Sequence, residues 1–184
     1  WQPLREPDAM GALLAALDAT LARLGTDHVD LWLLHGWSSV VPAEETLSAL
    51  DAAVSSCRAR YAGVSNLAGW QTAAAATWQR AWPGRARIVA TQVEYSLLER
   101  GVEREVLPAC ADGGIGLLAW SPLGRGVLTG KYRHGVPSDS RGASPHLRDF
   151  VTRHLNESAA GGVEAVATAA DSFRWRVTKS RRCG

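Results

Sequence analysis

The chain has 184 residues, enough for one domain with a buried core, and 46% hydrophobic and 21% charged residues give it an ordinary globular composition. A formal net charge of +2 argues against a dedicated nucleic-acid-binding or membrane-surface protein. Three cysteines without short spacing argue against a disulfide framework or a metal site, and with no signal peptide and no membrane-spanning run they indicate a soluble cytoplasmic protein.

Helices and strands are predicted to alternate from the start of the chain. Pro7 and Asp8 suit the beginning of a helix, which carries leucines at helical spacing and stops at Gly25. The apolar run at residues 29–34 predicts a buried strand. A second helix opens at Pro42, with an apolar face formed by Leu47, Leu50 and Val54.

Three more strands are predicted further along, over residues 60–64, 88–93 and 115–119. The alanine-rich residues 68–80 predict one helix between them, and residues 100–112 predict another that Pro108 would bend. A weak helix with apolar positions from Leu147 to Leu155 and a short helix at residues 163–170 complete the pattern, and the last residues, 172–184, carry five basic residues and no acidic one.

Short apolar strands that alternate with helices predict a parallel sheet with crossover helices. An open doubly wound sheet and a (β/α)8 TIM barrel both fit that pattern. The dinucleotide motif G-x-G-x-x-G, typical of the open sheet, is missing, whereas polar or aromatic residues follow every strand, where barrel enzymes place their chemistry. A complete barrel takes about 250 residues, so four countable strands favour a partial (β/α)8 barrel.

The residues around the strand ends resemble the aldo-keto reductase family. The resemblance rests on four motifs in order: LGTDHVDL running into LLH at residue 35, RYAGVSN at 60–66, QVEYSLL at 92–98 and WSPLGRGVLTGKY at 120–132. It covers about residues 8–171 and is strongest with the bacterial branch that resembles potassium-channel β-subunits. Taken alone, each motif has a simpler interpretation, because Ser65-Asn66 could cap a helix and Gly124-Arg125-Gly126 could be a turn.

The resemblance implies an NADPH-dependent enzyme that reduces a small carbonyl compound to an alcohol. It implies that His35 orients the substrate carbonyl and that Trp37 walls the substrate pocket. The remaining family positions imply cofactor contacts. The nicotinamide would be held by Ser65, Asn66, Gln92 and Trp120, and the pyrophosphate by Ser121, Leu123, Gly124, Gly126 and Lys131.

The chain also departs from the family pattern. The Asp, Tyr and Lys that complete the family's catalytic tetrad have no counterpart here, so we expect an incomplete chain in which residues 1–171 are the central part of the barrel. Residues 172–184 do not match and are expected to be a disordered basic tail. Cys57 stands where the family usually has glycine, at a cost of about 1 kcal/mol if the backbone is left-handed there.

Two hypotheses for function remain open at this point. The first is the NADPH-dependent carbonyl reductase, present as an incomplete chain, and the second is a non-catalytic truncated barrel that binds nucleotide weakly or serves as an interaction module. No nucleic acid or membrane partner is expected, whereas unpaired strand edges predict self-association. The histidines other than His35 lack ligand spacing and are expected at the surface.

Overall fold

The computed structural model describes residues 8–155 and 161–169, and these form two compact units. The first unit comprises residues 8–93 and 101–120, and the second comprises residues 94–100, 121–155 and 161–169. The predicted basic tail at residues 172–184 lies outside the described residues.

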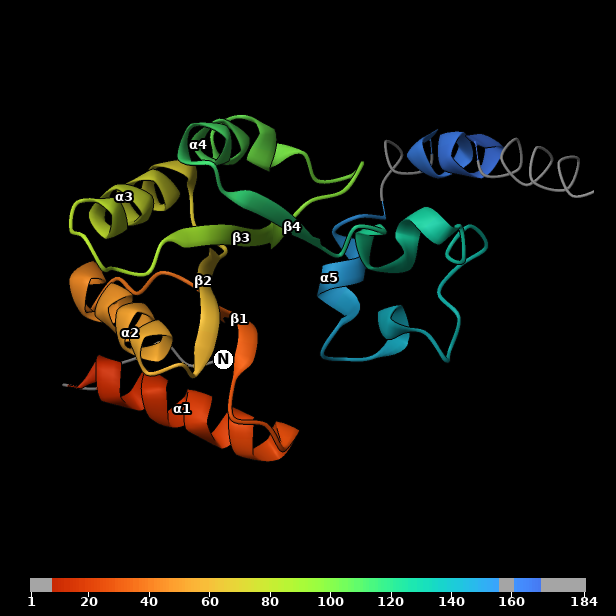
Figure 1. The fold of residues 1–184 in the computed structure, drawn as a ribbon. Helices are drawn as coiled ribbons and strands as arrows, with labels where there is room; N and C mark the ends of the chain where they lie inside the picture. Colours follow the sequence, from red (N-terminus) through yellow and green to blue (C-terminus); the bar gives the residue numbers. More distant parts are fainter. Residues whose placement is uncertain (1–7, 156–160, 170–184) are drawn as a thin grey trace, which may run out of the picture. The chain divides into compact units, whose positions relative to one another are not determined.

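A parallel sheet with helices along it makes up the first unit (Figure 1). Its strands follow the order β1-β2-β3-β4, which is also their order in the sequence. The helices α1 to α4 lie on the outer side of the curved sheet in Figure 1. The elements are α1 (Ala9–Leu24), β1 (Val29–Leu34), α2 (Ala43–Ser55), β2 (Ala59–Ser65), α3 (Gly69–Arg80), β3 (Ile88–Glu94), the 3-10 turn η1 (Gly101–Glu103), α4 (Val106–Gly113) and β4 (Gly116–Trp120).

This architecture confirms the predicted partial (β/α)8 barrel. Strands β1 and β2 pair in parallel from Val29 opposite Ala59 to Leu34 opposite Val64, so the two strands end at the same edge of the sheet. Strands β2 and β3 pair in parallel up to Ser65 opposite Gln92, after a register shift at Ala62 and Gly63. Helix–strand crossovers thus bring residues far apart in the sequence to one edge.

Local sequence signals account for most of the helix ends. Asp8 caps α1 by accepting a hydrogen bond on Oδ1 from the backbone N of Gly11 at 2.7 Å, and Gly25 ends it with a left-handed φ of +66°. The predicted bend at Pro108 is wrong. The helix begins only at Val106, which puts Pro108 in its first turn, where no backbone N–H is needed within the helix.

The core of the first unit lies between the sheet and its helices. Leu50, Ala62 and Val64 are almost fully buried there, and Trp32 and Trp37 pack against the same cluster. Strand β2 is buried along most of its length, whereas β4 is largely exposed and carries Leu118 with 40% of its surface accessible. The outer position of β4 in the sheet order explains this difference.

The second unit is built from short helical turns rather than strands. It contains η2 (Gly124–Thr129), η3 (Arg141–Ala143), α5 (Arg148–Thr152) and a helix over residues 161–169. A small core holds it together, formed by Val127, Leu128, Tyr132, Val151 and Val163. Among the described helices, none combines the length and hydropathy that a bilayer crossing needs.

Candidate active site at the strand ends and a cationic pocket

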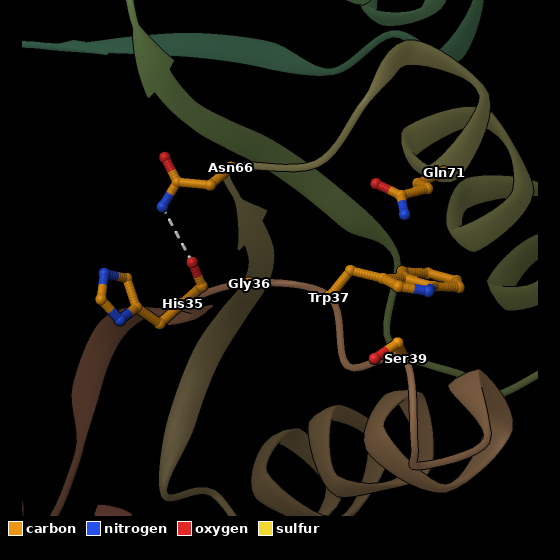
Figure 2. Close-up of a pocket in the computed structure, with 6 residues that line it drawn as sticks. All are labelled: His35, Gly36, Trp37, Ser39, Asn66 and Gln71. Atoms are coloured by element: carbon orange, nitrogen blue, oxygen red, sulfur yellow. Dashed lines mark hydrogen bonds between the residues drawn. The ribbon is translucent and has the colours of Figure 1, made fainter. Parts of the chain in front are cut away.

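The first unit has a pocket of about 500 Å³ at the end of its sheet, which we call the His35 pocket. It forms because β1 ends at Leu34 and β2 at Ser65, so that the residues that follow each strand meet at one edge. Figure 2 shows His35 and Asn66 together on one side and Trp37, Ser39 and Gln71 on the other. The lining consists of His35, Gly36, Trp37, Ser39, Asn66 and Gln71.

Asn66 connects the ends of three strands through its side-chain amide. Its Nδ2 donates to the backbone oxygen of His35 at 2.9 Å (Figure 2), and its Oδ1 accepts from Nε1 of Trp120 at 2.8 Å. The backbone of Asn66 is left-handed, with a φ of +57°, a conformation that asparagine tolerates better than most residues. The amide thus fixes the chain at His35 and the indole of Trp120 relative to each other.

Ser65 and Gln92 join the same network from β2 and β3. The Ser65 hydroxyl is buried and donates to the backbone oxygen of Gln92 at 2.8 Å, and the backbone N of Asn66 donates to that oxygen at 2.9 Å. The structure therefore brings together five of the residues expected to act in the site, His35, Ser65, Asn66, Gln92 and Trp120. Because the Ser65 proton is already donated, its hydroxyl is left as a hydrogen-bond acceptor.

Sequence reasoning missed three lining residues of the His35 pocket, Gly36, Ser39 and Gln71, and also Trp70, which packs behind Trp37 without lining the pocket. Trp70 contacts Trp37 edge to face, with 5.9 Å between ring centroids and 63° between planes. Gln71 accepts from the backbone N of Ala68 on Oε1 at 2.9 Å, which caps α3. The one available signal was the position of Gln71 three residues after Ala68, which is typical of a capping glutamine.

The second unit has its own pocket of about 450 Å³, which we call the cationic pocket. Arg125, Lys131 and Arg141 line it, and no acidic residue of the described part of the chain does so. Its remaining wall consists of Ser121, Pro122, Leu123 and Gly126. Of the residues expected to bind a pyrophosphate, the pocket thus gathers Ser121, Leu123, Gly126 and Lys131, with Gly124 in the same turn.

The turn at residues 124–126 depends on left-handed backbone at each position, with φ values of +54° at Gly124, +56° at Arg125 and +98° at Gly126. A Cβ atom at Gly126 would lie 2.8 Å from Cε of Lys131. The Lys131 side chain is flexible and could move away from such a Cβ, so the φ of +98° is what favours glycine at position 126. The Lys131 Nζ lies 5.0 Å from the centroid of the Tyr132 ring, which further fixes its direction.

The Glu94 carboxylate pairs with Arg125 and contacts two further basic side chains of the second unit. Its carboxylate is 14% exposed, and its Oε1 lies 3.6 Å from Nε of Arg125 and 3.4 Å from Nε2 of His154, while Oε2 accepts from Arg153 at 2.6 Å. His154 is 5% exposed, so its expected surface position is wrong. The carboxylate provides the reason, because it gives the buried imidazole a polar partner.

No group of three or more His, Cys, Asp or Glu side chains is arranged to hold a metal ion in residues 8–155 and 161–169. Burial raises the pKa of the Cys110 thiol, which keeps it protonated in the core, and Cys110 lines neither pocket. The residues that line the pockets offer hydrogen-bonding and aromatic side chains in the first unit and cationic side chains in the second.

Comparison with known proteins gives a consistent result. The model of the Aldo/keto reductase family matches residues 5–174. The chain is 39% identical over 130 residues to an L-glyceraldehyde 3-phosphate reductase from Escherichia coli (strain K12), a match that covers 70% of this chain and 37% of that protein. It is 36% identical over 162 residues to a probable voltage-gated potassium channel subunit beta from Arabidopsis thaliana, covering 84% of this chain and 48% of that protein.

A third relative is a versiconal hemiacetal acetate reductase from Aspergillus parasiticus, 37% identical over 118 residues, which are 63% of this chain and 33% of that protein. The chain thus spans between a third and a half of the length of these relatives.

Proposed function

Because the chain belongs to the aldo/keto reductase family, we propose that it supplies the nucleotide-binding and carbonyl-binding residues of an oxidoreductase that reduces aldehydes or ketones with NADPH. In this reaction the carbonyl carbon gains a hydride and the carbonyl oxygen gains a proton, which gives an alcohol and the oxidised nucleotide. The observation that carries the proposal is the hydrogen-bonded network of Asn66 with His35 and Trp120 at the sheet edge.

His35 would orient the substrate. Its ring lines the pocket, and the hydrogen bond from Asn66 to its backbone oxygen fixes the chain from which the ring projects. A carbonyl oxygen that accepts a hydrogen bond from the imidazole would become a better hydride acceptor, because negative charge develops on that oxygen as the hydride arrives. Trp37 would form the wall against which the rest of the substrate lies.

The nicotinamide end of the nucleotide fits the polar network of the first unit. Bound there, it would supply the hydride. Ser65 would accept a hydrogen bond from the carboxamide N–H, because its own proton is donated to the backbone oxygen of Gln92. The side chains of Gln92 and Asn66 would form further hydrogen bonds with the carboxamide. Trp120, whose indole is fixed through Asn66, would stack on the ring.

The phosphates of the nucleotide fit the cationic pocket of the second unit. Three cations and no acid line it, which is the composition that anionic phosphates require. The pyrophosphate would contact five residues of this region, Ser121, Leu123, Gly124, Gly126 and Lys131. Arg125 and Arg141, which also line the pocket, would add positive charge. The glycines let the backbone approach the phosphates closely.

A second candidate function is nucleotide binding without turnover. The observation that favours it is the lining of the His35 pocket, which includes an imidazole but no tyrosine or lysine among the described residues. Among the described residues, no phenol lines that pocket to donate the proton, and a positioned acid contributes about 10²–10⁴-fold to such a step.

Calorimetric titration with the two halves of the nucleotide tests the proposal unit by unit. Reduced nicotinamide mononucleotide should bind the parent chain, and Asn66→Ala should weaken it at least tenfold while leaving ADP binding unchanged. ADP binding should in turn weaken in Lys131→Gln and not in the control Arg133→Gln, because Arg133 faces Glu164 rather than the pocket.

NADPH and NADH are then titrated in parallel to establish the preference. If neither half-ligand binds saturably, the assignment of nucleotide-binding residues is wrong. If both bind but this chain reduces no aldehyde or ketone, nucleotide binding without turnover describes the chain by itself.

A further inference from the structure

The His35 pocket differs from the cationic pocket in carrying no charged wall. Besides the backbone at Gly36, the described residues that line it offer one indole, one imidazole, one hydroxyl and two amides, with no Lys, Arg, Asp or Glu among them. The cations that could bind a phosphate or a carboxylate line the pocket of the second unit instead. An anionic group brought into the His35 pocket would lose water without gaining a counter-ion, which is costly.

Trp37 provides the largest flat surface of the pocket, and the N-terminal turn of α3 holds it in place. Trp70 packs its ring against Trp37 edge to face at 5.9 Å between centroids. Trp70 is itself 63% exposed, and Trp37 also packs against the core of the first unit. A supported indole face favours planar, unsaturated ligands, because aromatic rings gain stacking energy beyond the burial of their area.

Gln71 gives the part of the pocket near Trp37 a hydrogen-bond donor. Its Oε1 is used by the backbone N of Ala68, so the two N–H groups of Nε2 are left as donors. In Figure 2 the Gln71 amide lies on the same side of the pocket as Trp37 and Ser39, opposite His35. A ligand whose carbonyl meets His35 would therefore meet a hydrogen-bond donor at its other end.

From these observations we propose that the His35 pocket selects neutral, planar carbonyl compounds with an uncharged hydrogen-bond acceptor remote from the carbonyl, and rejects phosphorylated or carboxylated ones. Trp37 contacts the ring of such a compound, Gln71 donates to its distal acceptor, and Trp70 is a positioning residue that acts through Trp37. The inference rests on the proposed function only for placing the carbonyl at His35. The contacts at Trp37 and Gln71 do not depend on turnover.

Four methyl ketones test the proposal by ligand-observed saturation-transfer NMR titration of the full chain. The reference is 4-methoxyacetophenone. The compound 1-(4-methoxycyclohexyl)ethanone lacks the flat ring, 4-ethylacetophenone lacks the acceptor, and 4-acetylphenyl phosphate carries a charge. We expect the cyclohexyl ketone to bind about tenfold more weakly than the reference, the ethyl compound about threefold more weakly, and the phosphate not measurably.

Single substitutions assign each preference to its residue. Trp37→Leu should abolish the preference for the flat ring while leaving the phosphate unbound. Gln71→Glu keeps an oxygen to cap α3 but removes the donor, so it should abolish the preference for methoxy over ethyl. Trp70→Ala should weaken the reference ketone about threefold, whereas Trp82→Ala, which removes an equally exposed tryptophan (62%) outside the pocket, should not.

The outcomes separate this inference from the proposed function. Equal binding of the aromatic and cyclohexyl ketones, tighter binding of the phosphate, or no saturable ketone binding in a chain that still binds ADP would each overturn the selectivity. Ketone selectivity that persists in a chain without nucleotide binding or turnover would support the pocket chemistry and reject the reductase proposal alone. A Trp70→Ala effect matched by Trp82→Ala would remove Trp70 from the wall.

Discussion

Replacing Cys57 with glycine should stabilise the first unit by about 1 kcal/mol. Cys57 lies in the turn from α2 to β2 with a φ of +61°, and it is exposed. The equivalent turns from α1 to β1 and from α4 to β4 carry Gly25 at +66° and Gly114 at +59°. A left-handed conformation costs a residue with a side chain about 1–2 kcal/mol, and the greater freedom of glycine in the unfolded chain offsets about 0.4–1 kcal/mol of the gain.

Urea unfolding followed by tryptophan fluorescence, in the presence of a reducing agent, measures this change as a shift in midpoint at constant slope. Cys57→Ala is the matched control, because it removes the thiol but keeps a Cβ, and it should leave the free energy of unfolding nearly unchanged. Gly25→Ala and Gly114→Ala should each lose about 1 kcal/mol, since an added Cβ meets nothing within 4 Å and only the backbone conformation is penalised.

Equal stabilisation by Cys57→Ala and Cys57→Gly would show that the thiol, and not the backbone, is responsible. No change in Cys57→Gly would refute the reasoning altogether, because the strain at φ +61° would then have no energetic consequence.

Two further predictions concern Glu94 and the outer strand β4. Glu94→Gln should lower the free energy of unfolding by about 3 kcal/mol in thermal melts, because it removes the carboxylate that pairs with Arg125 and contacts the buried His154. Arg153→Gln should cost less, since Arg153 is 53% exposed, and a Glu94→Gln melt like that of the parent would contradict the role of the cluster. In sedimentation velocity we expect the parent chain to form species larger than its 19.7 kDa monomer, and Leu118→Lys on β4 to reduce them. Leu97→Lys, at a leucine outside the strands that is more exposed than Leu118 (64% against 40%), should not, and a purely monomeric parent would refute self-association.

The strands and the first helix could be predicted closely because their signals are local. The strand expected at residues 29–34 is β1 as observed, and Asp8 and Gly25 bound α1 as their chemistry suggests. The prediction for residues 100–112 was wrong because a proline in the first turn of a helix and a proline that bends a helix look alike in sequence. The two cases differ in where the helix begins. Here it begins after Glu105, whose backbone lies against Gly69 of α3, so a tertiary contact lies at its start.

The site residues, too, divide into those with a local sequence signal and those placed by long-range contacts. His35, Asn66, Gln92 and Trp120 could be found because they follow or end strands, and parallel strands bring those positions to one edge. The pairing inside the network could not be predicted. The Asn66 amide bridges residues 31 positions back and 54 positions ahead, and Glu94 binds Arg153 and His154 about 60 positions ahead. Such pairs are set by packing, which leaves no local pattern.

The left-handed backbone positions at Cys57 and Asn66 differ in what their side chains do. In the turns from helix to strand, Gly25 and Gly114 adopt this conformation without a side chain, whereas Cys57 adopts it with an exposed side chain. After β2 and β4, Asn66 and Ser121 adopt it with side chains that bond the strand-end network or line the cationic pocket. Strain that persists where a polar side chain is needed indicates a functional position, because glycine would relieve it but remove the hydrogen bonds. By this argument we propose a functional role for Asn66, whose side chain makes hydrogen bonds that glycine would remove, whereas Cys57 could be exchanged freely.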